Sequence, residues 1–156
     1  MLEESSGILP IASCVYVNDK GEEFNIDSKQ LAIINGTRYY FMHLLSTSLY
    51  DAQMVCKEDG MSLISLEYQY ESDDVYAYIV QEQISDDYWT SGVRVGDRWL
   101  WSSTGVYLNY GNWNTGQPSE PLYPNQACIY FIAGKFSDSE CNGFERSFIC
   151  EEQPKC

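Results

Sequence analysis

Six cysteines, at positions 14, 56, 128, 141, 150 and 156, constrain this chain more than any other feature of its sequence. A structural zinc site needs several Cys or His ligands, including a closely spaced pair. This chain has no Cys-x-x-Cys pair and a single histidine, His43. The even cysteine count therefore favours disulfide bonds, which form in oxidising compartments. We expect a secreted, extracellular protein.

The balance of charge argues against two classes of partner. The chain of 156 residues has 23 acidic and 9 basic side chains, which give a net charge of −14. Such a surface repels phosphate backbones and anionic lipid headgroups, whose binding depends on clustered Lys and Arg. No stretch is apolar and long enough to span a membrane, and the first residues do not resemble a signal peptide. We predict no nucleic-acid partner and no membrane partner.

Apolar periodicity divides the chain into an arm and one domain. Residues 1–36 show little periodicity, so we expect an extended N-terminal arm with one short strand near residues 13–17. Residues 37–156 are expected to form a single α+β domain, since this length suffices for one core. Within it, residues 102–126 are dense in Gly, Asn, Pro and Ser, and long loops of this kind are usually functional.

Two helices are predicted within the domain. Residues 37–45 are rich in β-favouring aromatics and predict a strand. Residues 46–60 predict a helix that Ser48 caps and Gly60 ends, and residues 67–83 predict a second helix. Further short strands are expected at residues 61–66, 89–92, 99–101, 128–132 and 147–151.

The outer face of the second predicted helix is acidic. No basic residue occurs between Lys57 and Arg94, whereas acidic residues are frequent there. This pattern is typical of a solvated helix face, and a docking surface for a basic partner is the alternative.

The sequence lacks the residue combinations that known classes of catalytic site require. The one histidine, His43, lies in the first predicted strand, where we expect a structural role. The chain has no Gly-x-Ser-x-Gly motif, no phosphate-cradling loop and no thiolate expected to be free. Asp73 and Asp74 are adjacent and expected to face solvent, which does not suit the acid and base pair of a glycosidase. We predict that the protein is not an enzyme.

A series of short motifs, in order along the chain, resembles the C-type lectin-like domain family. The motifs are Thr-Arg-Tyr-Tyr-Phe at 37–41, Asp-Ala-Gln at 51–53 before Cys56, Tyr-Trp-Thr-Ser-Gly at 88–92, Trp-Leu-Trp-Ser-Ser-Thr-Gly at 99–105, Tyr-Gly-Asn-Trp at 110–113, Gly-Gln-Pro at 116–118, Asp138 before Cys141, and Phe-Ile-Cys-Glu at 148–151. Two of these motifs, Trp-Thr-Ser-Gly and then Trp-Ser-Ser-Thr-Gly, are similar to those of arthropod humoral members. The resemblance implies two helices flanking small antiparallel sheets, a long ligand-binding loop and disulfide staples.

The resemblance also implies the cysteine pairing. It pairs Cys56 with Cys150 and Cys128 with Cys141. Cys14 and Cys156 are left over, and they form either a bridge within one chain or a disulfide between two chains, so the protein is expected to be a monomer or a disulfide-linked dimer. Asn35 begins an Asn-Gly-Thr acceptor for N-glycosylation, which predicts a glycoprotein.

The family's calcium site is expected to be degenerate in this chain. The family positions that hold the ion correspond here to Gln117, Ser119, Gln126, Ser137 and Asp138. Calcium takes several oxygen ligands and its affinity rises with the number of carboxylates, but only Asp138 supplies a carboxylate. We expect calcium to bind weakly or not at all, and no other cofactor. Glu120 is an alternative source of a second carboxylate.

Aromatic residues complete the expected ligand site. Tyr107, Tyr110, Tyr123 and Phe136 lie in or near the long loop and are expected to contact a ligand together with Gln117, Ser119, Glu120, Gln126 and Asp138. The four tryptophans, at positions 89, 99, 101 and 113, match family core residues and are expected to be buried.

These expectations together predict a secreted, non-catalytic recognition module with an eroded calcium and sugar site, which binds a protein or glycan ligand. The alternative is a calcium-dependent, galactose-type carbohydrate-binding lectin of innate immunity. A third reading is a structural, ice-binding or surface-binding derivative of the fold.

Overall fold

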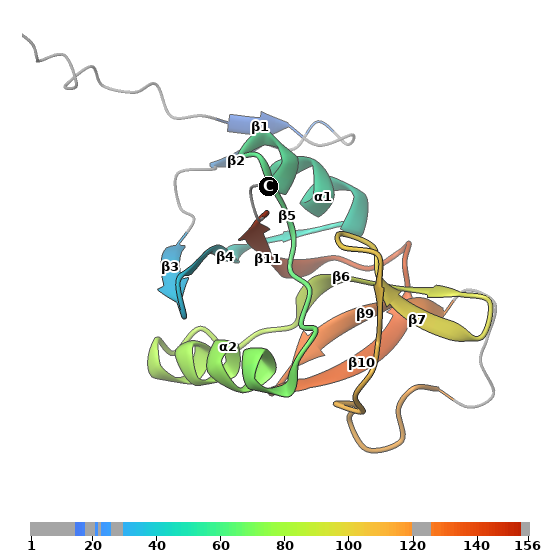
Figure 1. Cartoon of the computed structure of the whole chain (residues 1–156). Coiled ribbons are helices and arrows are strands. Elements are labelled where there is room, and N and C mark those ends of the chain that lie inside the picture. Colours follow the sequence, from blue (N-terminus) through green and yellow to red (C-terminus); the bar gives the residue numbers. More distant parts are fainter. Residues whose placement is uncertain (1–14, 18–20, 22, 26–29, 120–125, 154–156) are drawn as a thin grey trace, which may run out of the picture.

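The computed structural model of the chain describes residues 15–17, 21, 23–25, 30–119 and 126–153, and the account that follows concerns these residues (Figure 1). The helices are α1 (Leu49–Glu58) and α2 (Gln69–Gln81). The strands are β1 (Val15–Val17), β2 (Glu23–Asn25), β3 (Gln30–Ile34), β4 (Thr37–Thr47), β5 (Met61–Leu63), β6 (Tyr88–Val95), β7 (Arg98–Trp101), β8 (Val106–Tyr107), β9 (Gln126–Ile132), β10 (Lys135–Glu140) and β11 (Arg146–Glu152).

Nine of these strands form one connected sheet. Its main path runs β10-β9-β6-β11-β4-β3, while β5 pairs with β11 and β7 connects β6 to β8. All pairs are antiparallel except β6 with β11. The expectation of separate small antiparallel sheets is therefore corrected to one mixed sheet. The helices α1 and α2 lie on opposite sides of it (Figure 1).

Both helices begin and end close to the predicted residues. The Ser48 side chain accepts a hydrogen bond from the Asp51 amide at 3.1 Å, as an N-cap does. Gly60 follows α1 with a φ of 69°, a left-handed conformation that suits glycine after a helix end. In α2, Val75 and Ile79 face the core. Both predicted helices are therefore observed, each slightly shorter than its predicted range.

Two tight hairpins were not predicted. Asn35 and Gly36 join β3 to β4 with φ values of 51° and 82°, and Ala133 and Gly134 join β9 to β10 with φ values of 51° and 80°. Positive φ at both central residues is the mark of a type I′ turn. The first hairpin attaches residues 30–34 to the domain sheet, although the division at residue 36 itself stays a prediction.

The core consists of two clusters on the two sides of the sheet. One lies against α2 and contains Trp99, Trp101 and Phe136, and the other lies against α1 and contains Trp89. Trp113 packs against the first cluster. The predicted burial is confirmed for Trp89, Trp99 and Trp101, whereas Trp113 is partly buried at the edge of the core.

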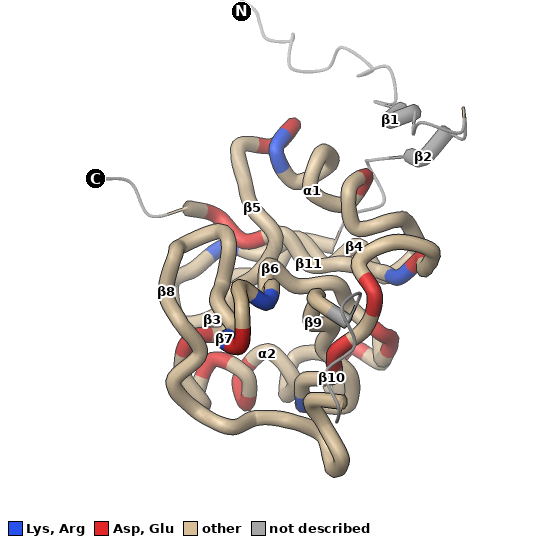
Figure 2. Tube along the Cα trace, turned by 90° about the vertical axis from the view of Figure 1, so that its right-hand side faces the viewer, with Lys and Arg blue, Asp and Glu red and all other residues tan. Residues whose placement is uncertain are grey.

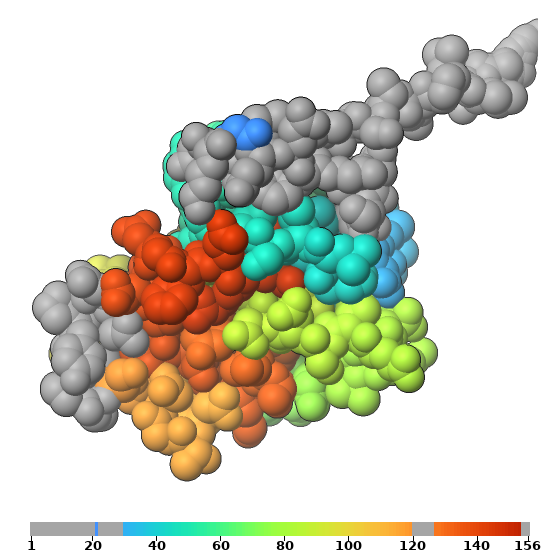
Figure 3. All heavy atoms as spheres, turned by 180° about the vertical axis from the view of Figure 1, so that it is seen from behind, coloured from blue at the N-terminus to red at the C-terminus, as the bar shows by residue number. Residues whose placement is uncertain are grey.

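Two disulfides link distant parts of the domain. Cys56 bonds to Cys150 and Cys128 bonds to Cys141, with Cα atoms 5.3 and 5.2 Å apart, as expected. The first ties α1 to β11, and Figure 3 shows the residues of β11 (red) beside the segment around α1 (teal). Cys14 and Cys156 lie outside the described residues, so their pairing stays a prediction.

Candidate functional site

Three of the predicted calcium ligands bond to one another. Asp138 lies in β10, and its Oδ1 atom accepts hydrogen bonds from the backbone N–H and the Oγ hydroxyl of Ser119, both at 2.9 Å. The Asp138 amide donates to Oε1 of Gln117 at 3.0 Å. The Gln117–Pro118 peptide bond between the two loop residues is cis. The carboxylate and the amide oxygen therefore anchor the loop to β10.

Of the remaining predicted calcium ligands, Ser137 and Gln126, the structure describes the side chain of Ser137. The Ser137 hydroxyl accepts a hydrogen bond from the Asn114 side chain at 3.2 Å. Gln126 begins β9, but its side chain is outside the described part of the structure. Glu120 and Tyr123 also lie outside the described residues, so their roles stay predictions.

Among the side chains that the structure describes, the donors of this cluster fall short of what a calcium ion requires. Asp138 is 5% exposed, and its Oδ2 atom is buried without a hydrogen-bond partner. Calcium takes about six to eight oxygen ligands, whereas the other oxygens of Asp138 and Gln117 here already accept bonds from the protein. Within the described ranges, no group of three or more His, Cys, Asp or Glu residues could hold a metal ion.

We expect Asp138→Ala to release the loop at Ser119. Hydrogen bonds to a charged acceptor contribute about 1.5–3 kcal/mol, which corresponds to roughly 10–100-fold faster amide exchange when they are lost. Hydrogen exchange followed by NMR measures this at the Ser119 amide. Asp138→Asn keeps one acceptor oxygen and should show a smaller increase. Equal exchange in the wild type and both variants would show that Asp138 does not hold the loop.

Phe136 is corrected from a ligand contact to a core residue. Its side chain has no exposed area. It packs edge-on against Trp101, Tyr110 and Trp113, with ring centroids 5.4, 5.8 and 6.0 Å apart. These rings enclose Phe136, so a ligand at the surface does not reach its ring.

The two described tyrosines of the long loop differ in their accessibility. Tyr110 is half-buried, and its hydroxyl donates to the Leu66 carbonyl at 2.6 Å and lies 2.8 Å from the Ser72 hydroxyl. Burial raises the pKa of Tyr110 to about 12. Tyr107 is 41% exposed, and the Arg98 guanidinium lies 3.6 Å from its ring centroid. Of these two, Tyr107 is the one available to a ligand.

A groove opens between β7 and the first part of the long loop. Its volume is about 430 Å³. We call it the long-loop groove, and it is lined by Arg98, Trp99, Leu108, Asn109, Tyr110, Gly111 and Trp113. Arg98 was not among the predicted site residues. The alternation of the strand was the available signal, because Trp99 and Trp101 point inward and their neighbours point outward.

A second group of charged residues lies beside α2. The carboxylate of Glu151, on β11, accepts a hydrogen bond from the Ser65 amide at 2.9 Å. Burial, followed by the charges of Glu71 and Glu67, raises the pKa of Glu151 to about 7. Figure 2 shows further acidic positions (red) around α2. The acidic helix face is therefore observed, while its docking to a basic partner stays a prediction.

Both the sequence and the fold of this chain match those of known proteins. The family model of the lectin C-type domain matches residues 45–152. The chain belongs to the C-type lectin domain family. The domain superimposes on the carbohydrate-recognition domain of the mouse scavenger receptor C-type lectin with a TM-score of 0.68 and 24% identity, covering 81% of this chain and 95% of that structure. The predicted fold class is thereby confirmed.

Sequence relatives of the domain come from mammals and an insect. Mouse C-type lectin domain family 4 member G is 26% identical and covers 78% of this chain. The mouse low affinity immunoglobulin epsilon Fc receptor is 24% identical and covers 88% of it. The chain spans about two fifths of the length of these two relatives. The C-type lectin mosGCTL-7 of Aedes aegypti is 20% identical, covering 79% of this chain and 89% of its own. The arthropod character stays a prediction.

Two further observations bear on the class of protein. Among the described residues, neither helix has the length and apolarity needed to cross a membrane. The relatives named above are C-type lectins or a receptor, and nothing in the described residues indicates catalysis. The domain is a C-type lectin domain by family and has the C-type lectin fold.

Proposed function

We propose that this domain recognises a protein or glycan ligand through the long-loop region without a bound calcium ion. The observation that carries the proposal is the anchoring of Gln117 and Ser119 on Asp138. In this arrangement the predicted ligand oxygens serve to fix the loop to β10. The loop therefore has its own internal support where the family uses an ion.

The long-loop groove is the contact surface in this proposal. It combines aromatic walls from Trp99 and Trp113 with the amide of Asn109 and the cation of Arg98. Apolar walls with a few polar groups are typical of ligand sites, and the volume of about 430 Å³ lies within their usual range. The exposed ring of Tyr107, stacked under Arg98, extends this surface.

The relatives support both ligand classes. One is named as an immunoglobulin Fc receptor and one structure as a carbohydrate-recognition domain. A calcium-dependent galactose-type lectin is the second candidate, because Gln117 is retained and Asp138 Oδ2 has no partner within the described residues. One free carboxylate oxygen is far below the ligand number that calcium requires.

Secretion is part of the same proposal. Disulfides persist in oxidising environments, and the two bridges of this domain are consistent with an extracellular site. Glycosylation at Asn35 and a role in innate immunity remain predictions. Asn35 is exposed at the β3–β4 turn, where its side-chain amide donates to Asp74.

Calcium titration tests the proposal. We expect no calcium binding by isothermal titration up to millimolar concentrations, and a glycan-array or ligand signal that EDTA does not reduce. Arg98→Ala should abolish that signal, whereas Lys135→Ala, which removes an exposed charge from β10, should leave it unchanged. Micromolar calcium binding, with EDTA-reversible retention on galactose resin, would overturn the proposal in favour of the second candidate.

Restoring the calcium ligands that this chain has lost provides a complementary test of the proposal. The triple variant Ser119→Asp, Gln126→Glu and Ser137→Asn returns the oxygen ligands that the family resemblance implies. We expect it to bind calcium with a dissociation constant of about 0.1–1 mM, the range of extracellular modules. Adding Asp138→Asn to the triple variant should remove this binding. Binding by the wild type at the strength of the triple variant would contradict erosion of the site.

A further inference from the structure

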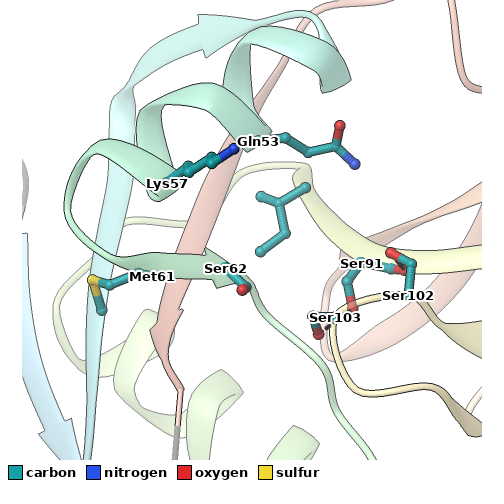
Figure 4. Close-up of a pocket in the computed structure, with 8 residues that line it drawn as sticks. Gln53, Lys57, Met61, Ser62, Ser91, Ser102 and Ser103 are labelled. Carbon is teal, nitrogen blue, oxygen red and sulfur yellow. Dashed lines mark hydrogen bonds between the residues drawn. The ribbon is translucent and has the colours of Figure 1, made fainter.

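A separate cavity lies between α1, β5 and the β6–β7 region. Its volume is about 340 Å³, which is large enough for a small ligand. It shares no lining residue with the long-loop groove or with the Gln117, Ser119 and Asp138 cluster. Figure 4 shows the side chains that converge on it from these elements.

The helix side of the cavity is polar and carries a positive charge. Gln53 and Lys57 are four residues apart on α1, so they lie on one face of the helix. In Figure 4 the Lys57 side chain extends along α1 to the base of the Gln53 side chain, whose amide continues away from it in the same direction. Within the described part of the chain, neither side chain has a hydrogen bond or ion pair. Lys57 thus adds a cation and Gln53 an amide to the lining of the cavity.

The opposite side of the cavity is lined by hydroxyl groups. Ser103 Oγ donates to Ser91 Oγ at 3.0 Å, and Ser102 Oγ donates to the Ser91 carbonyl at 2.8 Å. Ser91 is 3% exposed, so this network is held in place by the fold. A hydroxyl can donate one hydrogen bond and accept two. The Ser91 hydroxyl therefore keeps a donor for a ligand oxygen, and Ser62 adds another hydroxyl from β5.

The floor of the cavity is apolar. Met61 and Leu63 of β5 line it and are 7% and 3% exposed. An apolar wall beside convergent polar groups matches the usual composition of small-molecule sites. Such a wall suits the C–H face of a saturated ring, whose hydroxyls then point toward the serines.

We propose that this cavity binds a small polyhydroxylated carboxylate, such as a sugar acid. Lys57 and Gln53 hold the carboxylate, because an ammonium-to-carboxylate hydrogen bond is stronger than a neutral one. Ser62, Ser91 and Ser103 bond to the ring hydroxyls, and the β5 side chains contact the ring. The negative net charge of the chain opposes an anion at long range, but physiological salt screens charges beyond about 8 Å.

NMR titration of the full chain with sodium glucuronate tests the proposal at physiological ionic strength. Saturable shifts are expected at the amides of Ser62, Ser91 and Ser103 and at the Gln53 side chain. Glucose has the same ring without the carboxylate and should bind at least tenfold more weakly. N-acetylneuraminate, titrated in parallel, distinguishes a larger sugar acid from a uronic acid as the source of the carboxylate.

Two variants separate the contribution of charge from folding. Lys57→Gln should weaken glucuronate binding about tenfold or more while leaving the glucose response and the unfolding curve unchanged. Lys135→Gln removes an exposed lysine of β10 and should not change binding. Equal binding of glucose and both acids, shifts confined to residues 108–119, or the absence of saturable shifts with both acids would overturn the proposal. None of these measurements requires calcium, and shifts at residues 108–119 would report binding at the long-loop groove instead.

Discussion

Replacing Cys56 and Cys150 together by alanine is expected to lower the free energy of unfolding by about 4–5 kcal/mol. The disulfide closes a loop with a sequence separation of 94 residues. In the chain-entropy model, cross-linking so long a loop removes a large part of the unfolded chain's freedom. The melting temperature should fall by about 15 °C, since a domain of this size loses about 2–4 °C per kcal/mol. Thermal and urea unfolding, followed by tryptophan fluorescence, measure both quantities.

The second disulfide provides a matched comparison. Cys128 and Cys141 are separated by 13 residues, so alanine at both positions should cost about 3 kcal/mol. Cys56 and Cys150 are both buried, whereas Cys141 is partly buried beside the buried Cys128, so the first double variant also removes slightly more packing. A loss at Cys128 and Cys141 equal to or larger than that at Cys56 and Cys150 would contradict the loop-length explanation.

Glu151 is expected to make the stability of the domain depend on pH. Its folded pKa of about 7 lies above its ordinary value of 4.5, mainly because the carboxyl is buried and partly because Glu71 and Glu67 face it. Between these values the folded state keeps a proton that the unfolded chain has released. The stabilisation is therefore complete below about pH 4.5 and is lost as the pH rises to 7. The loss should be about 3 kcal/mol, at about 1.4 kcal/mol for each pH unit.

The variant Glu151→Gln isolates this effect. The amide can still accept the hydrogen bond from the Ser65 amide but carries no titrating charge. The variant should match the wild type near pH 4.5 and exceed its stability by about 3 kcal/mol at pH 8. Glu140→Gln removes the same charge from an exposed position on β10 and should follow the wild-type profile. Parallel profiles for wild type and Glu151→Gln would refute the prediction.

Local sequence patterns predicted the helices and the core because these depend on neighbouring residues. Ser48 caps α1 as expected, since a cap contacts only the next turn. The missed β3–β4 hairpin was also readable, because Asn35-Gly36 is a strong turn signal. The signal was overlooked because the residues before it lack clear alternation. The strand β10 was not predicted, because the few residues between Phe136 and Cys141 were expected to belong to the ligand-binding region.

The sites could be predicted only in part. The resemblance identified Gln117, Ser119 and Asp138, but their mutual hydrogen bonds arise from the approach of a loop to β10. The sequence predicted a ligand contact at Phe136 and not its burial, because the rings that cover it come from distant parts of the chain. The cavity beside α1 joins Lys57 to Ser91 and Ser103, and no local pattern connects these positions.

The position of β11 determines when this domain can fold during synthesis. It is the last described strand along the chain, yet it lies between β6 and β4 in the sheet. Until residues 146–152 leave the ribosome, β4 and β6 have no partner between them and expose edges that other chains can pair with. Cys56 must also wait for Cys150, so any disulfide that Cys56 forms before β11 is synthesised is non-native. Such a bond must be exchanged for the native one before the sheet can close around β11.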